Sequence, residues 1–487
     1  MACNTDTIQV TVNGGFQAMW ASVLDGVGNF DQGQAALIRQ TIGTDNEGNN
    51  YTALIARDDT ITPNPYPEFS SSLTKRTSGG DVVWVVDRVL DLFHWWVKPT
   101  LRVFGDRVFT FWGNEMHVFT TDGGFSYACS YDEAGQTAPK HLYAGSAILN
   151  SVTGRLNLFS TRMAIDTPGG QPPPDSGGEP RLLDVDPATG DLVNSWELTG
   201  FDMSDTAVQG RIFGPYMLQL DDGRVNLYGL DTSVLVTSVV TFSADFATIE
   251  NARTYPIAIG PAANIGAGLI AFTDAVSGSS TTPKNGYFLD ENDAVMARIA
   301  IPINGEDSTK LDVFTRLPDG DILWSGMGSA NYPEAQIVWL KSDLSGATLG
   351  SVGYRNTSQV ENADFYVGPY SPQTNTIVLT LNEINNTNQN GERATVIGIP
   401  LSMPVTLKEV NYDLVVDNRV IAPTTHSLLQ TDTEQDFSGT GSLVVSPKII
   451  THAITPTVKT DLTPLAEPWQ KDSGNVTFTR TELILTP

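Results

Sequence analysis

The stretch YMLQLDDGRVNLYG, residues 216–229, has the pattern of a β-hairpin. An apolar run leads into the pair Asp222-Gly223, and a run in which apolar and polar residues alternate follows it. Asp-Gly pairs supply the positive φ that a tight turn between antiparallel strands needs. The stretch therefore predicts two antiparallel strands joined at Asp222-Gly223.

The same pattern recurs along the chain. Turns of this first kind are expected at Gly105-Asp106, Thr153-Gly154, Asp319-Gly320 and Thr374-Asn375. A second kind of turn, led by Asp, follows one or two strands later, in the stretches 119–129, 182–198, 240–252, 287–299 and 339–352. The two kinds alternate at about 40 to 55 residues once a Pro/Gly-rich insertion at 167–180 is set aside, which is the size of a propeller blade.

This self-similarity predicts an all-β chain that forms a six- or seven-bladed β-propeller. Each unit has room for four short strands, and a ring closed by strands from both ends of the chain leaves no exposed sheet edge at the closure. The alternative is a long irregular array of β-sandwiches. The propeller is expected to span residues 51–423.

The flanks differ from the repeats. Residues 1–50 are expected to form an N-terminal segment, in which Phe16, Met19, Trp20, Val23 and Leu24 have the spacing of a short amphipathic helix. The residues from 424 to 487 are rich in Thr, Ser and Pro, with scattered β-prone runs. They predict an extended C-terminal arm that pairs with a neighbouring chain, and the N-terminal helix could dock on a partner or on its own domain.

The composition excludes several classes of partner. The chain of 487 residues has 28 Lys and Arg against 55 Asp and Glu, which gives a formal net charge of −27. Binding to nucleic acid requires clustered basic residues, and an anionic membrane surface attracts the same residues. We therefore expect neither a sequence-specific nucleic-acid partner nor membrane insertion.

The ends and the cysteines point to synthesis in a cytoplasm. The N-terminus has no basic region followed by an apolar one, so no secretion signal is expected. No apolar stretch approaches the roughly 18 residues of a membrane helix. Cys3 and Cys129 are too few for a disulfide framework and are expected to be free thiols.

The segment TTDGGFSY, residues 120–127, resembles the Asp-box of sialidase-type and related propellers. Thr120, Asp122, Gly124, Ser126 and Tyr127 stand in the places that the motif requires. In such a box the Asp carboxylate accepts backbone N–H groups, the glycine takes the turn, and the aromatic ring packs beneath it. The resemblance implies a structural turn and a propeller fold, with no particular activity.

The search for chemistry gives mostly negative results. The five histidines are scattered, and no zinc, nucleophile-elbow or phosphate-loop motif occurs. We expect no catalytic, cofactor-binding or metal residue and no cofactor. Calcium at Asp184, Asp186, Gly190 and Asp191 is the weaker alternative to a hairpin turn there, because these residues miss the EF-hand register.

Two features of the sequence are compatible with a carbohydrate-active protein. The adjacent residues Trp95 and Trp96 could form a sugar platform, although such a pair in a β-rich chain is more often buried. Pairs of acids such as Asp221/Asp222 and Asp290/Asp293 could serve a hydrolase, but 55 acids place such pairs together by chance. The arginine cluster and the nucleophile pair of a sialidase are missing.

These observations favour a non-catalytic structural protein of a bacteriophage virion, in the tail or associated with the head. Its partners would be other virion proteins and copies of itself, with a host-surface glycan or receptor as a further partner. It would be made in the host cytoplasm and work in the virion. The alternatives are a carbohydrate-active propeller hydrolase and a module that binds a surface glycan or receptor.

Overall fold

The structure, a computed structural model, describes the chain as a series of β-strands and the turns that join them. The described residues are 8–12, 20–24, 39–58, 68–90, 100–112, 115–133, 140–164, 179–197, 216–231, 236–255, 259–274, 284–293, 295–301, 310–327, 334–343, 347–356, 362–371, 376–384, 393–400, 424–425, 445–449 and 457–459. Every regular element among them is a strand, and none of these residues belongs to a helix long and apolar enough to cross a membrane. The all-β prediction is confirmed.

The strands follow one another as antiparallel meanders. In chain order these are β3 (Arg39–Thr44), β4 (Asn50–Asp58), β5 (Glu68–Arg76), β6 (Val82–Leu90), β7 (Thr100–Phe104), β8 (Arg107–Trp112), β9 (Glu115–Thr120), β10 (Phe125–Glu133), β11 (Lys140–Leu149), β12 (Leu156–Ala164), β13 (Glu179–Val185), β14 (Leu192–Glu197), β15 (Tyr216–Gln219), β16 (Val225–Asp231), β17 (Val236–Phe242), β18 (Ile249–Tyr255), β19 (Ile259–Gly266), β20 (Leu269–Asp274), β21 (Lys284–Asp290), β22 (Val295–Ile301), β23 (Lys310–Arg316), β24 (Ile322–Met327), β25 (Glu334–Leu340), β26 (Ala347–Asn356), β27 (Asn362–Ser371), β28 (Thr376–Ile384) and β29 (Arg393–Pro400). The hairpin predicted at Asp222-Gly223 is the pair β15–β16, in which Gln219 lies opposite Val225.

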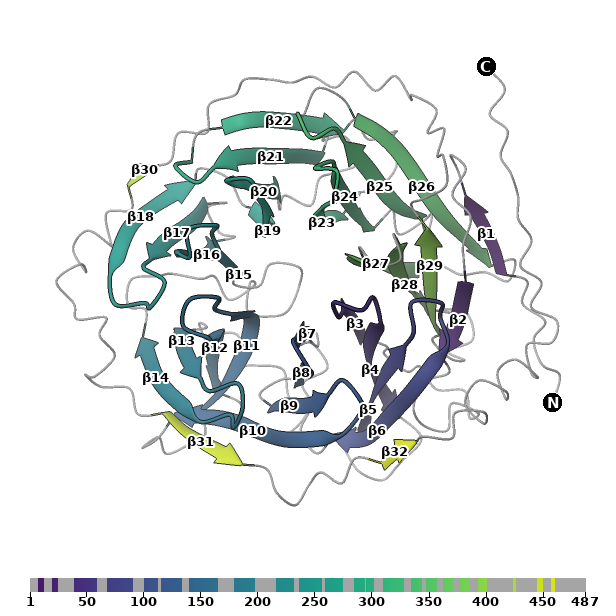
Figure 1. The fold of residues 1–487 in the computed structure, drawn as a ribbon, viewed down its shortest axis with the longest axis horizontal. Coiled ribbons are helices and arrows are strands. Elements are labelled where there is room, and N and C mark those ends of the chain that lie inside the picture. The colour runs from purple at the N-terminus through teal and green to yellow at the C-terminus, as the bar shows by residue number, and fades with distance from the viewer. Residues whose placement is uncertain are drawn as a thin grey trace.

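The meanders stand around a common centre, so the chain forms a β-propeller (Figure 1). The inner strands β3, β7, β11, β15, β19, β23 and β27 each contact the next, and β27 contacts β3. The ring of inner strands is therefore closed. The outer strands β6, β10, β14, β18, β22 and β26 lie at the rim (Figure 1).

The ring is completed by a strand from the N-terminus. Strand β2 (Trp20–Leu24) pairs with β29, with Trp20 opposite Gly398 and Leu24 opposite Ala394. The helix predicted over residues 16–24 is therefore wrong where the structure describes it, and Phe16 and Met19 lie outside the described residues. The aromatic and β-branched side chains of this segment suit a strand, and the open edge of β29 supplies the partner that a lone helix lacks.

Four further strands from the two termini pair with the rim. Strand β1 (Ile8–Val12) pairs with β26, β30 (Thr424–Thr425) with β18, β31 (Val445–Ile449) with β10, and β32 (Thr457–Lys459) with β6. The predicted N-terminal segment 1–50 thus supplies β2 and β3 to the ring, and three strands of the predicted arm 424–487 lie on this chain's own rim. The division at residues 50 and 423, and partners in a neighbouring chain, stay predictions.

The predicted count of six or seven blades is not confirmed. The described strands form six sheets, and one of these has nine strands. In that sheet β10 pairs with β11 through Asp132 and His141, so two meanders, β7–β10 and β11–β14, share one ladder. The count depends on how this sheet is divided.

The apolar core lies between neighbouring meanders rather than within any one of them. One cluster joins Phe159 and Trp196 to Val225 and Phe242 across two meanders, and another joins Phe288 of β21 to Phe314 and Trp324. Aliphatic and aromatic side chains alternate with polar ones along most strands, so each sheet presents an apolar surface to its neighbours. The apolar alternation in the sequence is thus the feature that stacks the units.

Candidate functional site

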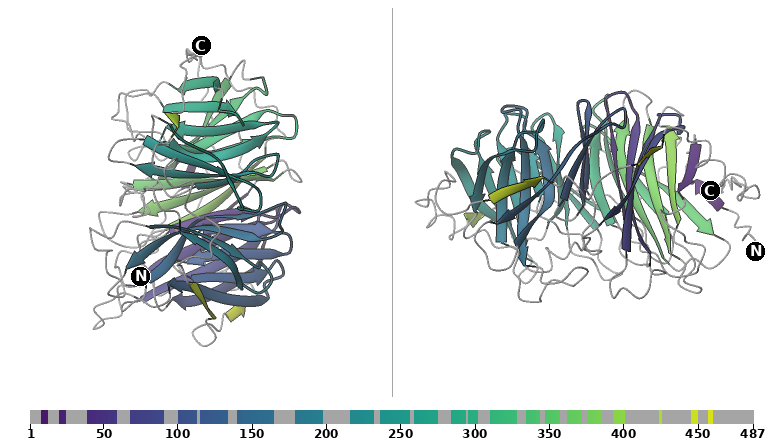
Figure 2. Two further views of the ribbon diagram at one scale, coloured as in Figure 1. Left: turned by 90° about the vertical axis from the view of Figure 1, so that its left-hand side faces the viewer. Right: turned by 90° about the horizontal axis from the view of Figure 1, so that it is seen from below.

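The two ends of the strands carry different kinds of connection. At one end, here called the turn face, lie the short turns at 45–49, 77–81, 105–106, 121–124, 150–155, 186–191, 220–224, 243–248, 267–268 and 317–321. Because successive strands are antiparallel, the connections that alternate with these turns along the chain start and finish at the opposite end, here called the connection face. They include the stretches 91–99, 165–178 and 198–215. Figure 2 shows the turns gathered along one edge of the ring in the right-hand view.

The Asp-box residues predicted as a structural turn lie at the turn face between β9 and β10. The Thr120 hydroxyl donates to the Asp122 carboxylate, and the Gly124 N–H donates to the same oxygen at 3.4 Å. These bonds lower the pKa of Asp122, and the bond from Thr120 has the larger effect. Asp122 is exposed, so the carboxylate orders the turn from the solvent side rather than from within a core.

The aromatic residue of the box also contacts the next meander. The Tyr127 hydroxyl donates to the carbonyl of Pro187 at 2.9 Å, in the turn between β13 and β14 of the next meander. Ser126 is exposed. The ring of Tyr127 also lies where a Cβ on Gly190 would meet it, at 2.6 Å. Tyr127 thus joins two meanders, and the stabilising role of the whole motif stays a prediction.

Contacts of this kind recur around the ring. The turn between the third and fourth strands of a meander is bound by the meander before it. The Thr121 carbonyl accepts from Lys75 at 2.7 Å and Trp84 at 3.2 Å. The Ala244 carbonyl accepts from Asn150 at 2.6 Å. These bonds satisfy turn carbonyls and fix each unit against its neighbour.

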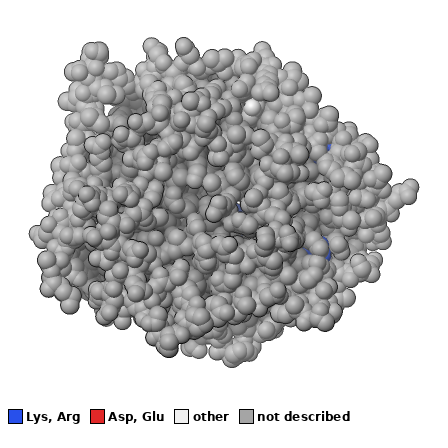
Figure 3. Space-filling view, turned by 180° about the vertical axis from the view of Figure 1, so that it is seen from behind, with Lys and Arg blue, Asp and Glu red and all other residues white. Residues whose placement is uncertain are grey.

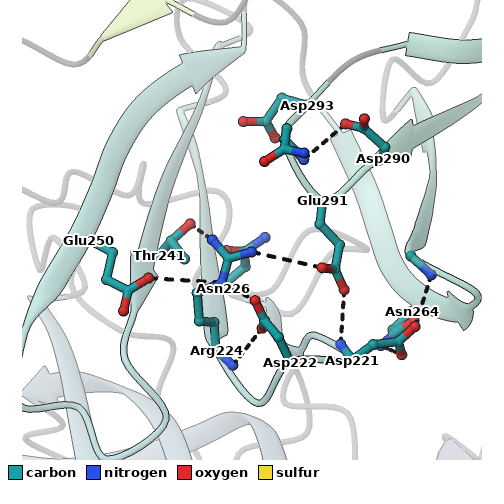
Figure 4. A network of polar contacts seen from close by, with 12 residues as sticks. Asp221, Asp222, Arg224, Asn226, Thr241, Glu250, Asn264, Asp290, Glu291 and Asp293 are labelled. Carbon is teal, nitrogen blue, oxygen red and sulfur yellow. Dashed lines mark hydrogen bonds and ion pairs between the residues drawn. The ribbon is translucent and has the colours of Figure 1, made fainter.

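The most highly charged of these contacts surrounds Arg224 (Figure 4). Its guanidinium lies 2.5 Å from Asp222, 3.8 Å from Glu250 and 3.8 Å from Glu291. Glu291 also accepts the backbone N–H of Asp221 at 3.0 Å. The acids around Arg224 are therefore occupied by donors, and this cluster holds two meanders together rather than offering a free acid–base pair.

The carboxylate of Asp221 is held in the same way. It accepts the Gly268 N–H at 2.9 Å and the Asn264 amide at 2.9 Å. These bonds hold the pKa of Asp221 below its usual value, and the bond from Gly268 has the larger effect. The predicted acid pair Asp221/Asp222 is thus adjacent in space, but its two carboxylates bind different partners.

The lowered pKa of Asp221 predicts how its contribution to stability depends on pH. Because the folded pKa is below the unfolded value of about 3.9, the contribution is complete above that value and is lost as pH falls through the folded pKa. We expect Asp221→Asn to flatten the decline of the melting midpoint as the pH falls below about 4. Thermal unfolding followed by circular dichroism measures this, with Asp222→Asn as the matched control. An equally steep decline in Asp221→Asn and the wild type would contradict this prediction.

A buried polar network lies between β18 and the turn after β21. Arg253 and Asp293 each have 5% of their side chain exposed, and their charged atoms lie 2.5 and 2.8 Å apart. Tyr255 donates to the same carboxylate, and Arg253 donates to Thr241 at 2.7 Å. Burial alone would lower the pKa of Arg253, but Tyr255 and Asp293 outweigh it, so this pKa is raised.

Sequence reasoning missed this network. Asp293 was considered only as one of a chance pair with Asp290, whose carboxylate instead accepts the Asn292 N–H at 2.9 Å. The available signal was Arg253 inside a strand run, where a charged residue that must be buried needs a partner. Arg76, fully buried in β5, is a second such arginine, and burial lowers its pKa to about 10.

The turn considered for calcium is a hydrogen-bonded hairpin. Asp186 accepts the Ala188 N–H at 2.8 Å, and Asp191 accepts the Thr189 hydroxyl at 2.8 Å. Asp184 lies within β13, and burial raises its pKa. Gly190 has a φ of 80°, as the turn requires. Among the described residues no group of three or more His, Cys, Asp or Glu side chains could hold a metal ion.

The centre of the ring is the remaining candidate site. The inner strands β3, β7, β15, β19, β23 and β27 each stand at the end of a sheet, so each has one neighbouring strand. Figure 1 shows these strands around the common centre. Some backbone groups of the inner strands bond to side chains of a neighbouring inner strand: the Met217 N–H donates to the Ser146 hydroxyl at 3.2 Å, and the Gln219 carbonyl accepts from Asn264 at 3.0 Å. Figure 3 shows the connection face, where nearly all atoms belong to residues that the structure does not describe.

No protein-family model and no curated protein matches the chain. Among solved structures, the fold is similar to a GH43 β-1,3-galactosidase, with 10% identity, a TM-score of 0.32, and 58% of this chain and 92% of that one covered. A polysaccharide lyase, Uly1, has 11% identity and a TM-score of 0.37, with 79% and 98% covered. A sialidase has 9% identity and a TM-score of 0.20, with 94% and 53% covered.

These neighbours correct one prediction and leave another without support. The prediction of a non-catalytic protein is wrong by this comparison, since the three structures are carbohydrate-active enzymes. The propeller fold that the resemblance implied is the fold that the described strands form. Nothing in the comparisons supports a virion protein. At these identities the likeness concerns the fold alone.

Proposed function

We propose that this chain is a carbohydrate-active β-propeller, a glycoside hydrolase, that binds its glycan at the centre of the connection face. The observation that carries the proposal is the closed ring of inner strands, which, β11 apart, have no second neighbouring strand among the described residues. Sugar hydroxyls both donate and accept, so they complement N–H and C=O groups placed side by side. The turn face does not compete for this role, because its charged groups bind one another.

The proposal places the catalytic acids in the connections. A glycosidase needs two carboxyl groups that flank the scissile bond. The described carboxylates near the turns, such as Asp221 and Asp122, accept hydrogen bonds from their own fold. Acids of the connecting stretches are the first candidates to test, and they are Asp59, Asp91, Asp166, Asp175, Asp202, Asp205, Glu306, Asp307, Glu361 and Glu392.

The connection 91–99 is the first place to look for a sugar platform. It follows the outer strand β6, which ends at Leu90, and precedes the inner strand β7, which begins at Thr100. Trp95 and Trp96 belong to this stretch, which lies outside the described residues. An indole face offers a large apolar surface with one polar atom, which suits the faces of a sugar ring.

We expect Trp95→Ala/Trp96→Ala to weaken glycan binding about tenfold or more, equal to about 1.4 kcal/mol. A glycan array identifies the bound class, and calorimetry with that oligosaccharide measures the change. The control is Phe125→Ala, which removes an aromatic side chain that is 37% exposed on the outer strand β10, away from the ring centre. If the double variant and the control bind the oligosaccharide with equal affinity, Trp95 and Trp96 do not form a sugar platform.

Hydrolysis is tested on the same glycans. Reducing ends released by the wild type and lost in one or two Asp→Asn or Glu→Gln variants of the connecting acids would identify the catalytic pair. Binding without release of reducing ends would leave a glycan-binding module. Release by elimination, seen as an unsaturated product that absorbs in the ultraviolet, would indicate a lyase. If the protein neither binds nor cleaves any of these glycans, the proposal is refuted.

We also infer that the ring has seven blades. Dividing the nine-stranded sheet between β10 and β11 gives four-stranded meanders that start at each inner strand, and β2 serves as the fourth strand of the last. Support comes from the single pair of residues that joins β10 to β11, Asp132 and His141, against the nine pairs of β11–β12. An experimental structure counts the blades directly.

A further inference from the structure

The rim of the propeller is a series of strand edges, and terminal segments occupy several of them. β30, β31 and β32 of the C-terminal arm, residues 424–487, pair antiparallel with the outer strands β18, β10 and β6. Within the described residues, the outer strands β14 and β22 have no fifth strand. The arm therefore pairs with three rim edges through its main chain, and among the described strands the edges of β14 and β22 carry no added strand.

The longest of these pairings is β10–β31. Its register places Cys129 opposite Ile449 and Glu133 opposite Val445, with the three pairs between them also matched. Main-chain bonds to a strand edge depend on the geometry of the edge rather than on which chain supplies the added strand. The β10 edge of a second copy therefore offers β31 the same partners.

The arm is long enough to reach another molecule. Residues 401–423 separate β29 from β30, and residues 426–444 separate β30 from β31. An extended chain covers roughly 3.3 Å per residue, so either stretch can span several tens of ångströms. Exchange of identical segments between copies forms the same contacts and has a low free-energy cost.

We propose that the arm is exchanged between copies, so that β31 of one copy adds to β10 of a second copy. The proposal is independent of the glycan site, which lies at the ring centre. The open rim edge of β14, which contacts β31, adds a second feature that favours association. The side chain of Val193 on β14 is 41% exposed there. The net charge of −27 opposes close approach, so exchange should increase with salt concentration.

The register supplies a test that separates exchange from pairing within one chain. Directly opposite residues of an antiparallel pair have Cβ atoms about 4.5–5.5 Å apart, close to disulfide geometry. A donor chain carries Cys129→Ala and Ile449→Cys, and an acceptor chain keeps Cys129 without a cysteine in the arm. Both carry Cys3→Ser. The two full-length chains, with different tags, are produced together and oxidised with glutathione disulfide.

The expected result is a covalent heterodimer at twice the chain mass of 52.5 kDa, formed through Cys129 and the new cysteine. The control donor carries Lys448→Cys in place of Ile449→Cys. Lys448 lies opposite Ser130, so its neighbour Cys129 is on the other face of the sheet and no heterodimer should form. A second donor and acceptor, Ser446→Cys and Asp132→Cys in the Cys129→Ala background, repeat the test at another matched pair.

Two outcomes would overturn the proposal. In the first, a chain with both Cys129 and Ile449→Cys forms an internal disulfide, and neither mixed pair forms a heterodimer at any salt concentration. This result would show that each arm stays on its own rim. In the second, neither cysteine pair forms a disulfide, within one chain or between two chains. This result would show that β31 does not occupy the β10 edge in solution.

Discussion

Asp293→Asn is expected to lower the free energy of unfolding by about 3–5 kcal/mol, since it leaves the buried Arg253 guanidinium without its counter-charge. Asp293 has a φ of 66°, and asparagine tolerates this backbone conformation, so the substitution removes the charge and little else. The Tyr255 hydroxyl donates to the same carboxylate, so its bond weakens as well. Urea unfolding of the wild type and the variant measures the difference.

The neighbouring ion pair provides the control. Glu291 lies two residues away, in the same turn, and its carboxylate is 3.8 Å from the partly exposed Arg224. Partly solvated pairs contribute about 0–1 kcal/mol, so Glu291→Gln should have a small effect. Adding Arg253→Met to Asp293→Asn should recover part of the lost stability, because both charges are then absent. A loss no larger than that of Glu291→Gln would show that the pair contributes little.

Trp324→Ala is expected to lower the free energy of unfolding by about 3–5 kcal/mol through the cavity that it leaves. Trp324 has no exposed surface and stacks on Phe314, with ring centroids 5.3 Å apart. Its six-membered ring also covers Gly286 of the neighbouring meander, where a Cβ would come within 3.0 Å. The side chain therefore fills the space between two units, and urea unfolding measures its loss.

Gly286 makes this prediction specific to packing between the units. In the wild type, Gly286→Ala should be destabilising, whereas in a Trp324→Phe background the smaller ring leaves room and the same change should have less effect. The matched control is Met296→Ala at the exposed rim, where the change should stay within about 0.5 kcal/mol. If Gly286→Ala has the same effect in both backgrounds, the indole does not set the spacing of the two sheets.

The local structure of the turns could be predicted from the sequence because it depends on neighbouring residues. Gly105, Gly154, Gly223 and Gly320 all have the positive φ that their turns predicted. Thr374-Asn375 lies outside the described residues. The amphipathic spacing before Gly26 led to an error, because Trp20–Leu24 fits a helix or a strand and only the open edge of β29 decided between them.

The candidate site could be predicted only in part. Asp221 and Asp222 were recognised as adjacent acids, but Gly268, which donates to Asp221, belongs to a different turn that meets this one only when the meanders stack. The ring of inner edges has no local signature at all, since each inner strand resembles any other short strand. The arm was recognised from composition, and its pairing on β10 and β6 was not.

The sequence by itself thus determined the all-β class and the alternation of two kinds of turn. Each of these depends on residues a few positions apart or on simple totals. Tertiary structure alone decided that β2 completes the last meander, that Arg253 meets Asp293, and that inner edges surround one centre. These depend on pairs distant in the chain, whose meeting is fixed by how whole sheets stack and not by the identity of any one residue.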